Sequence, residues 1–295
     1  MQTILITGSN GFIGSTIVKQ LSANYRIIEC GTKPYASNKN KNKYIQWHIG
    51  YENEPETLQN TRIHTIIHAA AATPHNSTNK NIIQSNCTGT LQIAECAKQH
   101  AVKNVIYISG LTVVGHNHTV PITENTPVHP STTYQATKAA GEAIINQLST
   151  DTIRPIILRV PSPIGPRMPE HTILPVFIKD VLLHENIKIQ GKGTRKQNYL
   201  DVRDMAYAIE KILQNDQIQG IYNIGANNII SNLELAKLCN RILNGNSIIT
   251  HTGKPDPDEH IDWTTKDEKL RKVIGNYQKI TLQQSIIDIA NHILL

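Results

Sequence analysis

The fold of this 295-residue chain is decided by residues 3–14, which read TILITGSNGFIG. The first five residues are apolar or β-branched and predict a buried strand, and apolar side chains recur with helical spacing from Phe12 onward. Between them, Gly8, Gly11 and Gly14 occupy every third position. In such a strand–turn–helix, glycine permits the tight turn, the approach of the backbone to a pyrophosphate and the packing of helix on strand. Because the helix N-terminus then faces the phosphates, the stretch predicts a dinucleotide site.

Strand and helix patterns alternate through the first half of the chain. Further strands are predicted from RIIEC (26–30), YIQWHI (44–49), HTIIHAA (64–70), NVIYIS (104–109) and PIILRV (155–160), and a helix from residues 82–99. Strands joined by helices indicate a parallel sheet covered on both faces. We therefore predict an α/β fold, a Rossmann-type doubly wound parallel sheet with a smaller mixed α/β substrate lobe. Residues 1–160 should form the dinucleotide-binding domain, completed by part of 199–225, and residues 161–295 mainly the substrate-binding lobe.

Composition excludes several classes of protein. The apolar runs are far shorter than the roughly 20 residues that cross a bilayer, and the N-terminus has no basic head, so we expect neither a membrane segment nor a signal peptide. Four separated cysteines without a C-x-x-C pair favour buried thiols in a reducing cytoplasm, and the histidines lack metal-ligand spacing, so no metal is expected. The net charge of +6 is scattered apart from residues 38–43. This positive charge alone would be compatible with a nucleic-acid-binding protein. Binding of anionic small molecules explains the charge equally well, so we expect no nucleic-acid partner.

Six further motifs follow the glycine loop in a fixed order. They are IIHAAA (66–71), NCTGTLQIAECA (86–97), YQATKAAGE (134–142), LRVPSPIGPRMP (158–169), GKGTRKQNYLDVRDMA (191–206) and GIYNIGA (220–226). Together they resemble the extended short-chain dehydrogenases, the NAD-dependent epimerase/dehydratase group, over nearly the whole chain. The positions assigned to the cofactor are Gly8, Asn10, Gly11, Phe12, Ile13, Gly14, Thr32, Lys33, His68, Ala69, Ala70, Asn86, Lys138 and Pro161.

The pair Tyr134 and Lys138 is predicted to be catalytic. Their i, i+4 spacing places both side chains on one face of a helix, and a nearby ammonium lowers the pKa of a phenol. The resemblance implies that Tyr134 moves the proton and that Lys138 also binds the nicotinamide ribose. It also implies a Ser or Thr at position 110, where this chain has Gly110. Thr112 is the first substitute, since alternate residues of a strand share a face; Ser109 is the second and a bound water the third.

Substrate-side positions depart from the family pattern as well. Dehydratases of the family carry an Asp-Glu pair where this chain has Leu111 and Thr112, so a 4,6-dehydratase is not expected. Ser162 stands where Asn is frequent, and Gln197 where an arginine grips the nucleotide diphosphate. Arg195 is close enough in sequence to replace that arginine, because a guanidinium suits phosphate; alternatively it belongs to a basic hairpin turn. We assign Thr112, Ser162, Arg195 and Gln197 to the substrate.

The expected activity is that of an NAD(P)-dependent sugar-nucleotide epimerase or 4-keto-reductase, and the resemblance implies a homodimer formed through residues 82–99 and 134–148. The alternative is a non-catalytic sensor or scaffold of the same fold. Gly110 favours that alternative, whereas the intact Tyr134 and Lys138 favour the enzyme.

The cofactor's phosphate state depends on the end of the second strand. NAD enzymes of this fold place an acid there to hold the ribose hydroxyls, but the position is Gly31, with Glu29 two residues earlier. Thr32 and Lys33 offer a hydroxyl and a positive charge to a 2′-phosphate, so NADP is expected ahead of NAD; otherwise this is a basic loop with no part in selectivity. Three nearby lysines add to the positive field: Lys39, Lys41 and Lys43.

Overall fold

The order of the strands in the larger sheet sets the position of the site. The computed structural model describes residues 1–34, 42–149 and 152–295. Seven parallel strands run in the order β10-β6-β5-β4-β1-β2-β3. They are β1 (Thr3–Thr7), β2 (Arg26–Gly31), β3 (Lys43–Gln46), β4 (Thr65–His68), β5 (Asn104–Gly110), β6 (Arg154–Val160) and β10 (Gly220–Asn223). The order reverses at β1, which pairs with both β2 and β4, and ligands of such sheets bind beyond the carboxyl ends of the strands at this reversal.

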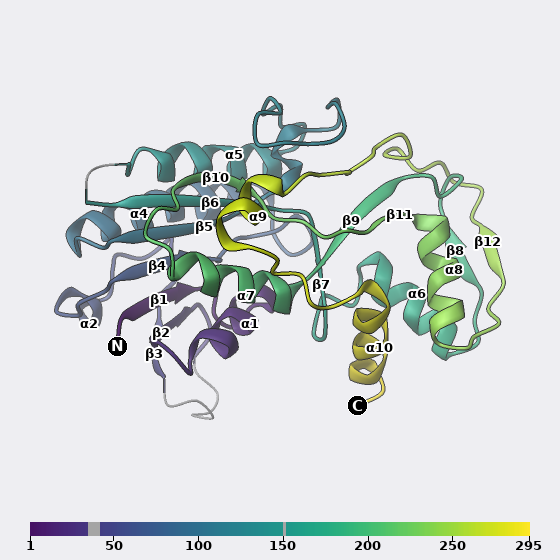
Figure 1. Ribbon diagram of the computed structural model, residues 1–295, viewed down its shortest axis with the longest axis horizontal. Coiled ribbons are helices and arrows are strands. Elements are labelled where there is room, and N and C mark those ends of the chain that lie inside the picture. Colours follow the sequence, from purple (N-terminus) through teal and green to yellow (C-terminus); the bar gives the residue numbers. More distant parts are fainter. Residues whose placement is uncertain (35–41, 150–151) are drawn as a thin grey trace.

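Helices cover both faces of this sheet (Figure 1). One face packs against α1 (Phe12–Leu21), α7 (Val202–Leu213) and α9 (Glu268–Ile274). The other packs against α2 (Glu56–Gln59), α4 (Gly89–Gln99) and α5 (Thr133–Asn146). Because both faces are buried, the inner strands read as nearly continuous apolar runs. The predicted doubly wound fold is confirmed.

A smaller lobe with its own apolar core lies beside the large sheet (Figure 1). Its helices are α6 (Ile173–Leu182), α8 (Asn232–Ile242) and α10 (Leu282–Ile293). Its strands form a three-stranded sheet of β11 (Ile229–Ser231), β9 (Lys196–Asp201) and β7 (Ser162–Ile164), and a pair of β12 (Ile249–His251) and β8 (Ile187–Ile189). Three elements of the second half, α7, β10 and α9, return to the large sheet.

The helix predicted at residues 82–99 is interrupted. It comprises α3 (Asn79–Ile83), the single π-helical turn η1 (Gln84–Thr88) and α4. Such π turns occur often at functional sites, and here the turn carries Asn86. Among the helices that the structure describes, none combines the length and apolar character needed to cross a membrane.

Candidate active site

A long groove opens at the carboxyl ends of β1, β2, β4, β5 and β6. It consists of two adjoining hollows of about 660 and 510 Å³, which share Gly8, Gly11 and Ala69. Ligand pockets commonly measure about 300–1,000 Å³, so the two hollows have room for a dinucleotide and a substrate end to end. The groove lies at the strand-order reversal, where this fold places its ligands.

The glycine loop forms the floor shared by both hollows. Gly8 has φ +68°, and a Cβ on Gly14 would lie 2.1 Å from the carbonyl oxygen of Gly8. The helix α1 begins at Gly11 without a side-chain cap, so no side chain of the cap residue occupies its first N–H groups. Asn10 lines the first hollow, and Phe12 and Ile13 line the second. This arrangement leaves backbone N–H groups facing the groove, as pyrophosphate binding requires.

The far end of the first hollow has no carboxylate from β2. Gly31, Thr32 and Lys33 line it, and a Cβ on Gly31 would lie 2.5 Å from the side chain of Asn10. Glu29 is buried, accepts a hydrogen bond from Asn42 and does not line the groove. The position where NAD enzymes carry an acid is a glycine here, and a side chain on it would have to displace the ends of the Asn10 and Tyr44 side chains. Of the lysines expected to add charge here, Lys39 and Lys41 lie outside the described residues, and Lys43 turns to the carbonyl of Thr57.

His68 lies behind the groove rather than in it. Its Nδ1 is 2.8 Å from the hydroxyl of Thr7, its Nε2 is 3.1 Å from that of Thr90, and the side chain is buried. Burial, and secondarily the charge of Lys138, lower the pKa of His68 from 6.5 to about 3. Both ring nitrogens are already engaged, so the expectation of direct contact between His68 and the cofactor is corrected. Ala69 and Ala70, which were assigned to the cofactor together with His68, do line the groove.

Asn86 also acts from behind the wall of the groove. Its amide oxygen accepts the N–H of Ala72 at 2.8 Å, and its amide nitrogen donates to the carbonyl of Ala72 and to the hydroxyl of Thr137. The side chain is buried and lines neither hollow. This corrects its assignment as a cofactor ligand: it holds the segment after β4 against α5.

Tyr134 and Lys138 lie on the first turns of α5, and both line the second hollow. The Lys138 ammonium donates to the carbonyl oxygen of Ile108 at 2.5 Å and lies 4.5 Å from the ring centre of Tyr107. Burial lowers the pKa of Lys138 from 10.5 to about 8, although the carboxylate of Glu142 opposes the shift.

The expected lowering of the Tyr134 pKa is not found. Burial raises the pKa of Tyr134 above its ordinary value of 10.0, because a low-dielectric surrounding disfavours the phenolate. The Lys138 ammonium is turned to the carbonyl of Ile108. In this arrangement Tyr134 is the neutral phenol, because its burial disfavours the phenolate.

The hydroxyl beside Tyr134 comes from Thr112. The strand β5 ends at Gly110, and the 3₁₀ turn η2 (Leu111–Val114) follows at once. A Cβ on Gly110 would lie 3.3 Å from Oγ1 of Thr112, and both residues line the second hollow. The prediction of Thr112 rests on strand alternation, but in the structure the turn brings its hydroxyl next to the position that a side chain at residue 110 would occupy.

Ser109, the second substitute for the hydroxyl missing at Gly110, already makes a hydrogen bond to a buried carboxylate. Its hydroxyl donates to the carboxylate of Glu142 at 2.6 Å, and Glu142 pairs with Arg159 at 2.8 Å in the protein interior. Removing a partner from a buried ion pair is costly, so this hydroxyl is held in a structural network. Ser109 also lines the second hollow, but its hydrogen bond to Glu142 leaves Thr112 as the first candidate for the missing hydroxyl.

On the substrate side, the groove is closed by Pro161, Ser162 and Gln197. The Ser162 hydroxyl donates to Oε1 of Gln197 at 2.9 Å. Arg195 lies outside the groove lining and pairs with Asp258 at 3.3 Å and Asp256 at 3.6 Å. The assignment of Arg195 to the substrate is therefore corrected: two carboxylates of the irregular segment before α9 hold its guanidinium.

Tyr199 is a residue of the groove that the sequence analysis does not assign to the site. Tyr199 lines the second hollow, is 3% exposed, and its hydroxyl has no hydrogen-bond partner in the described part of the protein. Buried polar groups are normally paired, so this hydroxyl is available to a ligand. The signal was present in the strand pattern, because Gln197 and Tyr199 are two apart on β9 and share a face.

The chain was compared with known proteins. A sequence model described as the NAD dependent epimerase/dehydratase family matches residues 4–225. The chain belongs to the NAD-dependent epimerase/dehydratase family. Among its curated relatives, dTDP-D-glucose 4,6-dehydratase of Dictyostelium discoideum is 31% identical over 265 residues, which cover 80% of this chain and 61% of that protein. The corresponding protein of Bos taurus is 30% identical over 253 residues, which cover 79% and 71%.

Solved structures share the fold over almost the whole chain. The UDP-glucuronic acid 4-epimerase from Bacillus cereus, in complex with UDP-glucuronic acid and NAD, has a TM-score of 0.88 at 22% identity and covers 99% of each chain. The UDP-glucose 4-epimerase from Thermotoga maritima, with UDP-glucose, has a TM-score of 0.87 at 22% identity, again over 99% of each chain.

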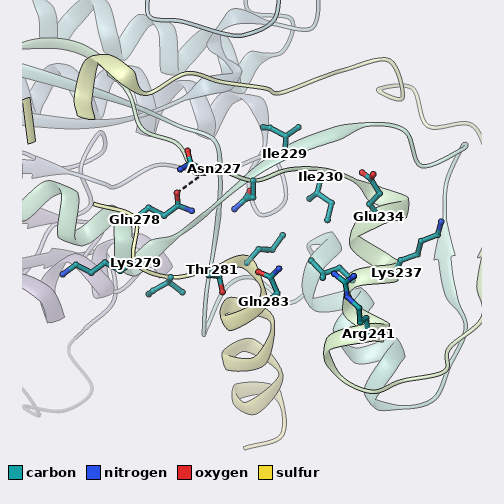
Figure 2. Close-up of a pocket in the computed structure, with 14 residues that line it drawn as sticks. Asn227, Ile229, Ile230, Glu234, Lys237, Arg241, Gln278, Lys279, Thr281 and Gln283 are labelled. Carbon is teal, nitrogen blue, oxygen red and sulfur yellow. Dashed lines mark hydrogen bonds between the residues drawn. The ribbon is translucent and has the colours of Figure 1, made fainter. Parts of the chain in front are cut away.

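A separate pocket of this family member lies between α8 and the segment leading into α10 (Figure 2). Lys237, Arg241 and Lys279 contribute cations to its lining. It contains no residue assigned to the cofactor or to proton transfer, and Figure 2 shows side chains of α8 on one side and of the segment around Gln278 and Lys279 on the other. The chemistry therefore belongs to the groove at the large sheet.

Proposed function

We propose that this chain is an NAD(P)-dependent sugar-nucleotide epimerase with Tyr134 as the acid/base. The main support for this proposal is that Tyr134, Lys138 and Thr112 line the same hollow as the glycine loop. Family membership supports hydride chemistry, and the named relatives and solved structures support a nucleotide-sugar substrate, since they act on dTDP-glucose or hold UDP-sugars.

The residues divide the reaction between them. When bound, the nicotinamide supplies the hydride acceptor and donor. Tyr134 takes the proton of a sugar hydroxyl as the hydrogen on the same carbon leaves as hydride, and it returns that proton when hydride is restored to the other face of the ketone. Thr112 donates a hydrogen bond to the reacting oxygen, where a donor is worth most as charge develops. Epimerisation thus leaves the cofactor in its starting oxidation state.

A 4-keto-reductase is the second candidate, and one observation favours it. Burial keeps Tyr134 as the neutral phenol, and the neutral phenol is the form from which a ketone oxygen is protonated during reduction. In that reaction Tyr134 would donate its proton to the carbonyl oxygen, and a bound reduced cofactor would supply the hydride for the carbonyl carbon, so one cofactor would be oxidised per product.

Water elimination is not proposed, although the named relatives are dehydratases. The position of the family's acid pair is taken by Leu111 and Thr112, and Leu111 is buried in an apolar cluster with Val113, Ile122 and Trp263. A carboxylate placed in that cluster would lose its hydration without a partner. The groove therefore lacks the acid that would protonate a leaving hydroxyl.

The test is incubation of the protein with UDP- and dTDP-hexoses, and separately with their 4-keto derivatives plus reduced cofactor. An epimerase yields the C4 epimer with no net change in cofactor, a reductase oxidises cofactor stoichiometrically, and a dehydratase yields a 4-keto-6-deoxy sugar. Tyr134→Phe should abolish turnover but keep cofactor binding, whereas Tyr51→Phe, at an exposed residue outside the groove, should change neither. No turnover of any substrate by the parent would favour the non-catalytic alternative.

For the cofactor, we propose that NADP is bound ahead of NAD. The proposal rests on Gly31, which supplies no carboxylate, and on Thr32 and Lys33 at the same end of the groove. Calorimetric dissociation constants for both cofactors test it, with Lys33→Ala expected to weaken NADP alone and Lys43→Ala as the control. Tighter binding of NAD by the parent would refute the preference.

We further propose that residues 1–160, with part of 199–225, hold the cofactor, and that residues 161–295 mainly hold the substrate. A homodimer through residues 82–99 and 134–148 is proposed with them, supported by two exposed apolar side chains in the first of these segments, Ile83 and Leu91. Light scattering should give twice the chain mass, and a monomer mass would refute the dimer. A cytoplasmic setting accords with four cysteines that are all free.

A further inference from the structure

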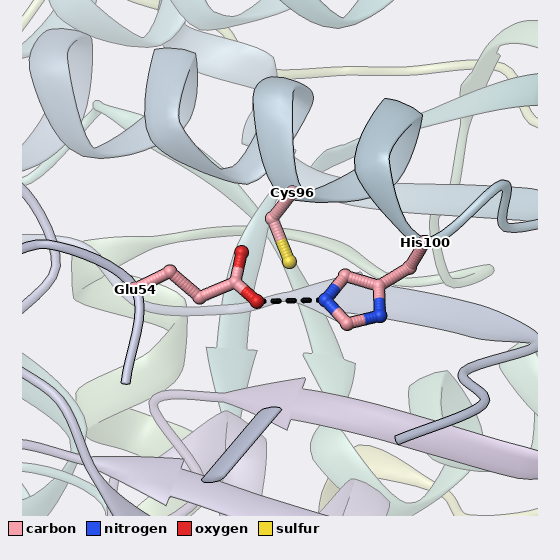
Figure 3. A group of neighbouring side chains, drawn as sticks. All are labelled: Glu54, Cys96 and His100. Atoms are coloured by element: carbon pink, nitrogen blue, oxygen red, sulfur yellow. Dashed lines mark hydrogen bonds and ion pairs between the residues drawn. The ribbon is translucent and has the colours of Figure 1, made fainter. Parts of the chain in front are cut away.

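A second cluster of ligating side chains lies away from the groove, at the amino end of β5 (Figure 3). Cys96 and His100 are one turn apart at the end of α4, and Glu54 comes from the segment between β3 and α2. Figure 3 shows the thiol, the imidazole and the carboxylate pointing toward one another. Their ligand atoms all lie within 4.8 Å of one another, with Cys96 buried and the other two partly buried.

The hydrogen bonds of His100 define the state of its ring. Nδ1 lies 3.1 Å from the carbonyl oxygen of Thr61, which can only accept, so Nδ1 carries a hydrogen. Nε2 lies 2.7 Å from Oε1 of Glu54, which is also an acceptor. In the neutral ring, the lone pair of Nε2 would face a lone pair of the carboxylate. A metal cation next to both atoms would be bound by these two lone pairs.

The arrangement around His100 matches that of a metal-bound histidine. Such histidines commonly donate their other N–H to a carbonyl or carboxylate, which fixes the tautomer and directs the free nitrogen at the metal. Here Thr61 provides that carbonyl. Ligands spaced i, i+4 on one helix face are a recurrent way to hold zinc, and Cys96 and His100 have that spacing.

The thiol of Cys96 completes a set with balanced charge. The side chain of Cys96 is buried, and its sulfur lies within 4.8 Å of the ligand atoms of Glu54 and His100. A divalent ion bound there would replace the thiol proton. One thiolate and one carboxylate then neutralise its two charges, and the imidazole stays neutral.

We propose that Glu54, Cys96 and His100 form a Zn²⁺ site, with water as the fourth ligand. Thiolate, imidazole and carboxylate are the ligands that zinc prefers. At bond lengths of about 2.0–2.1 Å, tetrahedral geometry separates nitrogen and oxygen ligands by about 3.3 Å, so Nε2 and Oε1 must part slightly. Glu54 allows this because it precedes α2 in an irregular segment.

The site would be structural rather than catalytic, because the groove lies at the opposite, carboxyl ends of the strands. Zinc would tie the segment after β3 to the end of α4. That segment begins with Trp47, His48 and Ile49, which line the first hollow of the groove. The proposal departs from the expectation of no metal, which rested on the spacing of histidines along the sequence.

Titration of the untagged, EDTA-treated full-length protein with Co²⁺ tests the proposal. We expect one equivalent to produce a thiolate-to-cobalt charge-transfer absorption, and Zn²⁺ to displace it. Cys96→Ser should abolish the band, and the control Cys239→Ser, at a buried cysteine of the smaller lobe, should keep it. His100→Gln and Glu54→Gln should each weaken cobalt binding by more than about tenfold, the lower limit typical of lost outer-shell partners.

Zinc X-ray absorption of the parent gives a second readout that needs no variant. One sulfur ligand at about 2.3 Å is expected, together with a higher unfolding temperature in zinc than in EDTA. A coordination shell of nitrogen and oxygen only, no cobalt band in the parent, or a band that persists in Cys96→Ser would overturn the proposal.

Discussion

The hydroxyl of Thr112 is predicted to take over the role of the side chain missing at Gly110. Oγ1 of Thr112 lies 3.3 Å from the Cβ position of Gly110, and it has no hydrogen-bond partner among the described residues. Thr112→Val keeps the branched shape and breaks no internal bond, so stability should hardly change. Loss of one donor to the reacting oxygen costs about 10²–10³ in kcat; a hundredfold loss equals about 2.7 kcal/mol of transition-state stabilisation.

Rescue distinguishes a catalytic hydroxyl from a merely structural one. Gly110 has φ −120° and ψ 143°, an extended conformation open to any residue. Its Cβ would make a tight but feasible contact with residue 112. Gly110→Ser combined with Thr112→Val should therefore restore most of the turnover, measured as steady-state kcat on the substrate found in the panel.

Ser109→Ala is the matched control for this pair of variants. It removes a hydrogen bond to the buried carboxylate of Glu142, so it should lower the free energy of unfolding by about 1–3 kcal/mol while leaving kcat per folded molecule near that of the parent. An unchanged kcat in Thr112→Val, or a collapse of kcat in Ser109→Ala, would refute the reasoning.

Three further predictions concern the loop, the buried ion pair and pH. Gly14→Ala places a Cβ 2.1 Å from the carbonyl oxygen of Gly8, so it should cost about 1–3 kcal/mol of stability and weaken dinucleotide binding; unchanged calorimetric affinity would contradict this. Arg159→Met leaves the buried carboxylate of Glu142 without its cation, so it should lower the free energy of unfolding, measured in urea, by about 3–5 kcal/mol. The double variant Arg159→Met with Glu142→Met should be more stable than Arg159→Met alone, and equal stability of the two would contradict the prediction. Because the folded-state pKa of Lys138 is lowered from 10.5 to about 8, the folded protein binds fewer protons between these values, and the parent should gain about 3 kcal/mol over Lys138→Met as pH rises through this window. Parallel stability curves for parent and variant would show that the shift is absent.

The sequence by itself determined the features that depend on neighbouring residues. Local patterns predict the strand β1, the glycine turn and the helix α1. These patterns are the apolar run, the glycine spacing and the helical repeat of residues 3–21. The same holds for the i, i+4 relation of Tyr134 and Lys138, because helix geometry alone places them on one face. The family follows from these motifs in their order, as the match over residues 4–225 confirms.

The tertiary structure decided which polar groups are free. His68 and Asn86 match motif positions and Arg195 lies two residues from one, yet their partners come from other strands, helices and loops. These partners occupy the groups expected to meet a ligand. A motif shows that a residue is present but says nothing of the hydrogen bonds it has already made.

Distance along the chain is the physical reason for the remaining differences. Thr112 was named for a strand face but is positioned by a turn, and the partner of Cys96 and His100 is Glu54, which belongs to a different segment. Tyr199 was within reach of strand periodicity, but only the folded protein shows that its hydroxyl is buried without a partner. Side chains far apart in sequence meet only through the packing of the sheet and its helices, which no local pattern specifies.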